Sequence, residues 1–137
     1  MNRSTLTNQR ERQWSALAHA SILLNMVTFI LGTVAVGVLY LVMRRRSSYV
    51  AFHALQSLVY QLIVWVGGWT VALAGWILIN ALPETMFTLF LMPLGFLINM
   101  IPMVGVIGGG LGAMSIGRGQ EFSYPRIGEW ALRVINR

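Results

Sequence analysis

Three long stretches without a charged residue constrain the fold of this chain more than any other feature. They cover residues 13–43, 47–83 and 85–117. A helix needs about 20 mostly apolar residues to cross the hydrocarbon core of a bilayer, and each stretch exceeds that length. Charged residues make up only 10% of the 137 residues, against roughly a quarter in soluble proteins. The sequence therefore predicts an all-α integral membrane protein in which residues 1–137 form a single transmembrane domain.

The first stretch can be threaded through the membrane in two ways. As one span, residues 13–43 separate the N-terminal arginines from the "RRR" run at 44–46; as a hairpin turning near Gly32, they return the N-terminus to the same side. In the hairpin, all ten arginines lie on one side, and the loop "ALPET" (81–85), with Glu84 and no cation, lies on the other. The positive-inside rule favours the hairpin. A turn at membrane depth then has to be covered by protein.

The predicted architecture has four helical segments, an N-terminal hairpin of two short helices and two long spans, at 13–31, 33–45, 48–80 and 84–117. Pro93 and Pro102 favour bends in the last of these. Residues 125–136 predict a C-terminal interfacial amphipathic helix with an apolar face of Ile127, Trp130, Ala131 and Val134. We expect a multi-pass protein of the bacterial cytoplasmic membrane with both termini cytoplasmic.

The glycine-rich run "GVIGGGLGAMSIGRG" (105–119) indicates helix packing. A phosphate-binding loop would follow a strand and carry a lysine, and the chain has neither a strand before this run nor any lysine. Small residues every four positions let membrane helices approach closely. One stripe in the run has this spacing, at Gly105, Gly109, Ala113 and Gly117. A similar stripe, at Gly68, Ala72 and Gly75, lies in the preceding span.

Polar residues inside the apolar stretches are the candidate functional residues. We expect a polar intramembrane layer of His19, Asn25, His53, Gln56 and Gln61. His19 lies seven residues beyond Arg12, and His53 lies seven residues beyond Arg46. If both arginines mark the cytoplasmic surface in the hairpin, both imidazoles lie roughly 10 Å from that surface toward the membrane centre and can meet. No carboxylate lies within a span and the chain has no cysteine, so we predict no catalytic residues and no metal site.

Three segments resemble a known family. They are "LAHASILLN" (17–25), "YVAFHALQSLVYQLIVW" (49–65) and "GRGQEFSYPRIGEWALRV" (117–134). They are similar to motifs of a family of small bacterial membrane proteins of unknown function, related to the channel-like subunit of the chloroplast inner-envelope (Tic) import translocon. The resemblance implies four helical segments, cytoplasmic termini, and functional positions at His19, Phe52, His53, Gln56, Tyr124 and Pro125.

Three functions stay open. The features favour a non-enzymatic accessory or assembly subunit, packed through its glycine stripes into a larger respiratory, photosynthetic or translocating complex. The first alternative is an oligomeric channel or translocon-like pore, although a pore usually has charged rings or a continuous polar face. The second is a haem- or chlorophyll-binding protein using His19 or His53, for which hydrogen bonding between helices is the favoured alternative; no cofactor is predicted.

The expected partners are the lipid bilayer and other membrane subunits or further copies of the chain. The net charge of +6 comes from arginines that flank apolar segments and form no basic face. This arrangement indicates membrane topology and contact with anionic headgroups, and argues against a nucleic-acid partner.

Overall fold

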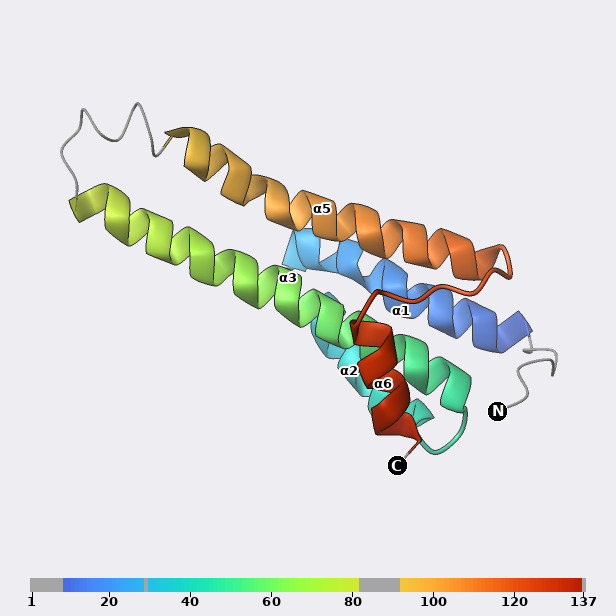
Figure 1. Ribbon diagram of the computed structural model, residues 1–137. Coiled ribbons are helices and arrows are strands. Elements are labelled where there is room, and N and C mark those ends of the chain that lie inside the picture. The colour runs from blue at the N-terminus through green and yellow to red at the C-terminus, as the bar shows by residue number, and fades with distance from the viewer. Residues whose placement is uncertain (1–8, 29, 82–91, 137) are drawn as a thin grey trace.

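The computed structural model describes residues 9–28, 30–81 and 92–136, and in this part of the chain every regular element is a helix. There are five, labelled as in Figure 1: α1 (Gln9–Thr28), α2 (Leu31–Met43), α3 (Ser48–Ala81), α5 (Met92–Gly117) and α6 (Ile127–Ile135). The all-helical prediction is confirmed. The expected start of the last span, at residues 84–91, lies outside the described residues. That residues 1–137 form one transmembrane domain stays a prediction.

The helices α1 and α2 form the hairpin that the arginines indicated. Helix α1 begins at Gln9, four residues before the predicted start, and ends at Thr28, while α2 begins at Leu31. The turn therefore comes before Gly32, which lies in the first turn of α2. A Cβ atom on Gly32 would collide with the backbone carbonyl of Ser21. Gly32 thus permits the two helices to touch and does not itself form the turn.

The long helices α3 and α5 run antiparallel, and the hairpin lies beside only part of their length (Figure 1). In the picture, the start of α1, the end of α5 and the α2–α3 connection lie toward one end of the bundle, and the other ends of α3 and α5 extend beyond the hairpin. Pro93 lies in the first turn of α5, where its missing N–H is not needed. Pro102 lies inside α5, which remains a continuous helix.

The glycine-rich run of α5 packs against other parts of the same chain. Added Cβ atoms on four glycines of this run would meet Val64, Tyr60, Ile22 and Phe122 respectively; these are Gly105, Gly108, Gly109 and Gly112. Close helix packing was expected, but it was expected to serve association with other subunits. The reason for the difference is the short hairpin, which places α1 directly against α5.

The remaining small residues have more room. Gly68 and Gly75 on α3 face Pro102 and Ile98 at 3.9 and 3.8 Å from an added Cβ, and Gly117 has no atom within 4 Å. Ala72 and Ala113 are half-buried.

The outer surface of α3 and α5 is apolar. These two helices are long and apolar enough to cross a membrane, over Ser48–Leu78 and Met92–Gly117, and α2 is a shorter apolar helix. Only 17% and 12% of their most apolar windows are buried within the protein, whereas the core helix of a soluble protein is mostly buried. The buried interior instead contains several polar side chains.

The C-terminal helix α6 begins at Ile127, two residues later than predicted. It packs against α3, with Gly128 and Ala131 buried. Trp130 and Val134, predicted on the same apolar face as Ala131, are exposed. One edge of the apolar face, which includes Ala131, therefore packs against α3. The other edge, with Trp130 and Val134, is exposed.

We predict that Gly109→Leu lowers the stability of the fold by about 1–3 kcal/mol, the usual penalty for overpacking a core. The new side chain would meet Ile22 and the backbone carbonyl of His19, and the carbonyl cannot swing away. Gly110→Leu is the matched control, because no atom lies within 4 Å of its added Cβ. The measurement is the free energy of unfolding in detergent. Equal stability of the two variants would show that α1 does not pack on α5 at Gly109.

Candidate functional site

Buried polar side chains lie along one face of α3, opposite α1, α2 and the segment after α5. Four residues of α3 share this face, since they recur every three to four positions; they are His53, Gln56, Ser57 and Gln61. With their partners they form two groups. We call these the glutamine cluster (Gln61, Ser57, Ser21, Asn25, Thr33) and the histidine cluster (His53, Gln56, His19, Tyr124).

Gln61 is the centre of the glutamine cluster and is fully buried. Its Oε1 accepts from Asn25 Nδ2 at 2.9 Å and from Thr33 Oγ1 at 3.2 Å, which brings α1 and α2 to α3. Its Nε2 donates to Ser21 Oγ at 2.8 Å and to Ser57 Oγ at 3.1 Å. One amide therefore connects three helices.

Asn25 closes the hairpin next to its turn. Its side-chain Oδ1 accepts the backbone N–H of Thr33 at 3.1 Å, while its Nδ2 donates to Thr33 Oγ1 at 2.8 Å. The first N–H groups of a helix have no partner within the helix. Asn25 thus supplies one of the acceptors that the start of α2 requires.

The histidine cluster lies about 12 Å nearer to the start of α3, since eight residues separate His53 from Gln61. His19 Nε2 and His53 Nδ1 are 3.4 Å apart, and His19 Nδ1 is 3.1 Å from the hydroxyl of Tyr124. Gln56 Nε2 is 2.9 Å from His53 Nδ1. Both histidines are buried.

Two backbone groups fix the orientation of the Gln56 amide. Its Nε2 donates to the carbonyl of Phe122 and its Oε1 accepts the N–H of Tyr124, both at 3.3 Å. Because Nε2 can only donate, His53 Nδ1 must accept and His53 is neutral. His19 then donates from Nε2 to the same atom and accepts the Tyr124 proton at Nδ1. The hydrogen bonds therefore run in one direction, from Tyr124 to His19 to His53.

Tyr124 reaches this cluster from the segment between α5 and α6. Its ring stacks on Tyr60 with centroids 4.0 Å apart, and Phe122 packs edge-on against His19. Burial raises the pKa of the Tyr124 phenol, and the nearby Tyr60 raises it further. The hydroxyl therefore stays protonated at physiological pH and remains a donor to His19.

All five residues of the expected polar layer lie in these clusters, although in two tiers and not in one. Sequence reasoning from residue types missed Ser21, Thr33 and Ser57, because hydroxyls occur widely in membrane helices. The helical spacing of 53, 56, 57 and 61 was the available signal for Ser57. Tyr124 had been indicated only through the resemblance.

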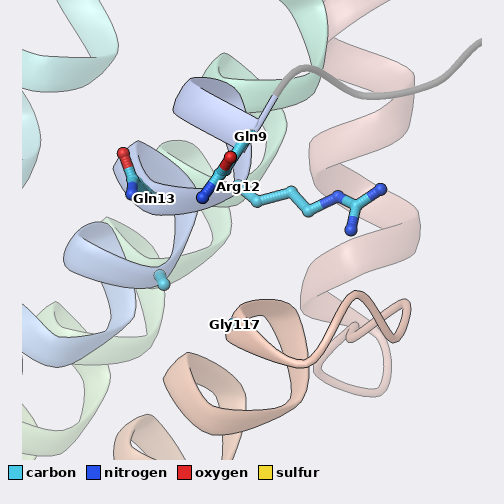
Figure 2. A pocket seen from close by; sticks show the side chains of 5 residues that line it. Gln9, Arg12, Gln13 and Gly117 are labelled. Carbon is cyan, nitrogen blue, oxygen red and sulfur yellow. The ribbon is translucent and has the colours of Figure 1, made fainter.

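A furrow on the outside of the bundle separates part of α1 from the end of α5. Two adjoining cavities of about 520 and 390 Å³ share Gln13 and Ala16. We call them together the α1–α5 furrow; they are lined by Gln9, Arg12, Gln13, Ala16, Leu17, Ala20, Ala113 and Gly117. Figure 2 shows Gln9, Arg12 and Gln13 on the first turns of α1, with Gly117 on the last turn of α5.

The two clusters and almost all of the furrow lie within a segment that matches a known family. A model of the MamF/MmsF family, described as the magnetosome magnetite crystal formation protein family, matches residues 10–131. The chain belongs to this family. No curated protein and no solved structure matches this chain.

Membership of the magnetite crystal formation family overturns the resemblance to the Tic-related family, which is wrong. The structure explains why the motifs misled. His53 and Gln56 bind one another and the segment before α6, and Phe52 packs on the His53 ring with centroids 5.0 Å apart. The motif residues hold a small helical bundle together, and such short motifs do not separate one membrane family from another.

Magnetite is an iron oxide, so the family raises the question of an iron site. Among the described residues, no group of three or more His, Cys, Asp or Glu side chains lies close enough to hold a metal ion. A haem bound by both histidines would have to lie between rings whose centroids are 5.6 Å apart, and their nitrogens already face each other. Both nitrogens of His19 have partners, which argues against a single-ligand pigment at that residue.

We predict that Tyr124→Phe lowers the free energy of unfolding by about 0.5–1.5 kcal/mol, the net worth of a typical hydrogen bond. The variant keeps the ring stacked on Tyr60 but removes the proton given to His19. Tyr40→Phe is the control, since Tyr40 packs against the core and its hydroxyl forms no hydrogen bond within the described part of the chain. An equal change in both variants would contradict the directional chain.

Proposed function

We propose that this chain is a non-enzymatic, multi-pass subunit of the magnetosome membrane that contributes to magnetite crystal formation by assembling with other membrane proteins. The observation that carries the proposal is the family match over residues 10–131. It replaces the respiratory, photosynthetic or translocating complex of the sequence analysis with the magnetosome.

The distribution of polar and apolar side chains supports membrane embedding. Fully buried side chains include His19, Asn25, Gln56 and Gln61, whereas tryptophans, leucines and valines cover the outside of α3 and α5. In water this arrangement would expose a large apolar surface to solvent. In a bilayer the same surface meets lipid, and the polar groups find their partners inside the bundle.

The chemistry of the described residues supports an assembly role more than direct iron binding. The polar groups of both clusters are engaged in bonds between helices. The described charges are mainly arginines near the termini of helices, including Arg12, Arg44–Arg46 and Arg118. Arginines repel iron cations.

We predict that positions 45 and 136 lie on the cytoplasmic side and that position 83 lies on the opposite side. The one-sided arginines are the physical reason. Single cysteines at these positions can be tested on intact isolated magnetosomes with a membrane-impermeant thiol reagent, because the chain has no native cysteine. Labelling of position 83 before the vesicles are opened with detergent, or protection of position 45 until detergent is added, would contradict this topology.

We predict that deleting the gene in a magnetite-forming bacterium that carries it changes the size or number of magnetite crystals, with restoration by the intact gene. The measurements are crystal dimensions by electron microscopy and co-purification of membrane partners in mild detergent. Crystals unchanged in size and number would refute the proposed function.

The variant Glu84→Gln separates assembly from iron binding in the same complementation experiment. Glu84 is the carboxylate expected on the side opposite the arginines, and it lies outside the described residues. We expect this variant to restore crystals as the intact gene does. If Glu84→Gln is present at normal levels and retains its partners but fails to restore crystals, the chain acts through a carboxylate and not through assembly alone.

A further inference from the structure

The lining of the α1–α5 furrow changes from polar to apolar along its length. Its end beside Gln9, Arg12 and Gln13 is polar, and its other end passes between Ala20 and Ala113. The helix rises roughly 16 Å from Gln9 to Ala20. Because these alanines are small, they leave a shallow channel between α1 and α5 where larger side chains would close the surface.

Arg12 lies at the polar end, near Tyr49, and the carboxylates Glu11 and Glu121 also act on Tyr49. The side chain is half-buried, and its guanidinium lies beside Gly119, just beyond the end of α5. Within the described residues, Arg12 forms no hydrogen bond or ion pair. The exposed amides of Gln9 and Gln13 stand one turn apart on the same helix (Figure 2). Figure 2 shows the Arg12 side chain extending away from these two amides, toward the segment that follows α5. The guanidinium is by itself a group suited to phosphate.

We propose that the α1–α5 furrow binds one anionic phospholipid from the leaflet on the arginine side. Its phosphate lies at Arg12, and one acyl chain lies along Ala16, Ala20 and Ala113. The proposal rests on the membrane embedding proposed above. It accounts for both halves of the furrow, since a phospholipid has a charged head and an apolar tail in this order and at this scale.

Charge complementarity favours a lipid over a second copy of the chain. Two copies in one membrane share the same orientation, so a copy seated in the furrow would bring its arginine-rich end beside Arg12. Like charges placed together oppose such contacts. An anionic headgroup in the same position neutralises Arg12, and basic segments at a membrane surface attract anionic lipids.

The test is lipid binding to the full-length protein in detergent, measured by native mass spectrometry with phosphatidylglycerol and phosphatidylcholine of identical acyl chains. We expect the first phosphatidylglycerol to bind about tenfold more tightly than phosphatidylcholine. Arg12→Gln should abolish this preference. Arg133→Gln, the same charge change at an exposed arginine of α6, should preserve it. If both variants lost the preference for phosphatidylglycerol equally, the preference would come from the overall positive charge and not from Arg12, and the proposed site would be wrong.

A second pair of variants tests the apolar half and decides the matter if Arg12→Gln does not fold. Ala113→Leu fills the channel and should weaken binding of both lipids, whereas Gly110→Leu, outside the furrow, should not. If Ala113→Leu instead converts a dimer into monomers, the furrow is a contact between copies and the proposal is wrong. A wild-type protein that binds neither lipid and stays monodisperse without detergent would refute membrane embedding as well.

Discussion

The hydrogen bonds of Gln61 hold the fold in its present form. A buried amide without partners in an apolar medium costs several kcal/mol, so α1, α2 and α3 must meet where Asn25, Thr33 and Ser21 can supply donors and acceptors. The short hairpin depends on this contact, because the side chain of Asn25 also accepts the backbone N–H of Thr33 in the first turn of α2. With the hairpin held there, α1 lies against α5 and the glycines of α5 become necessary.

The histidine cluster has a corresponding role nearer to the arginine end. It joins α1 and α3 to the segment between α5 and α6 through Tyr124 and Gln56. Since Gln56 binds backbone groups of that segment, the course of the chain after α5 is tied to the amide of a residue on α3. This explains why α6 returns to α3 and why its apolar face is shared between α3 and the surroundings.

The engagement of the polar groups inside the bundle bears on the proposed function. The polar side chains of both clusters are occupied in holding helices together, so the outer surface is where the protein meets other molecules. That surface is apolar along α3 and α5 and basic near the arginine end. The furrow between α1 and α5 joins these two regions, and it is the place where a polar ligand group and an apolar one can bind side by side.

The sequence by itself determined the helical class, the long apolar helices, the hairpin and the meeting of His19 with His53. These features follow from local signals: the length of uncharged stretches, the side on which arginines gather, and the rise of a helix per residue. The tertiary structure alone decided that Gly32 is a contact residue, that Gly109 packs inside the chain, and that Tyr124 donates to His19. Each of these depends on how far a helix is rotated about its axis and where a connecting segment returns. A sequence pattern shows which residues share a face of one helix, but the residue opposite that face belongs to another part of the chain.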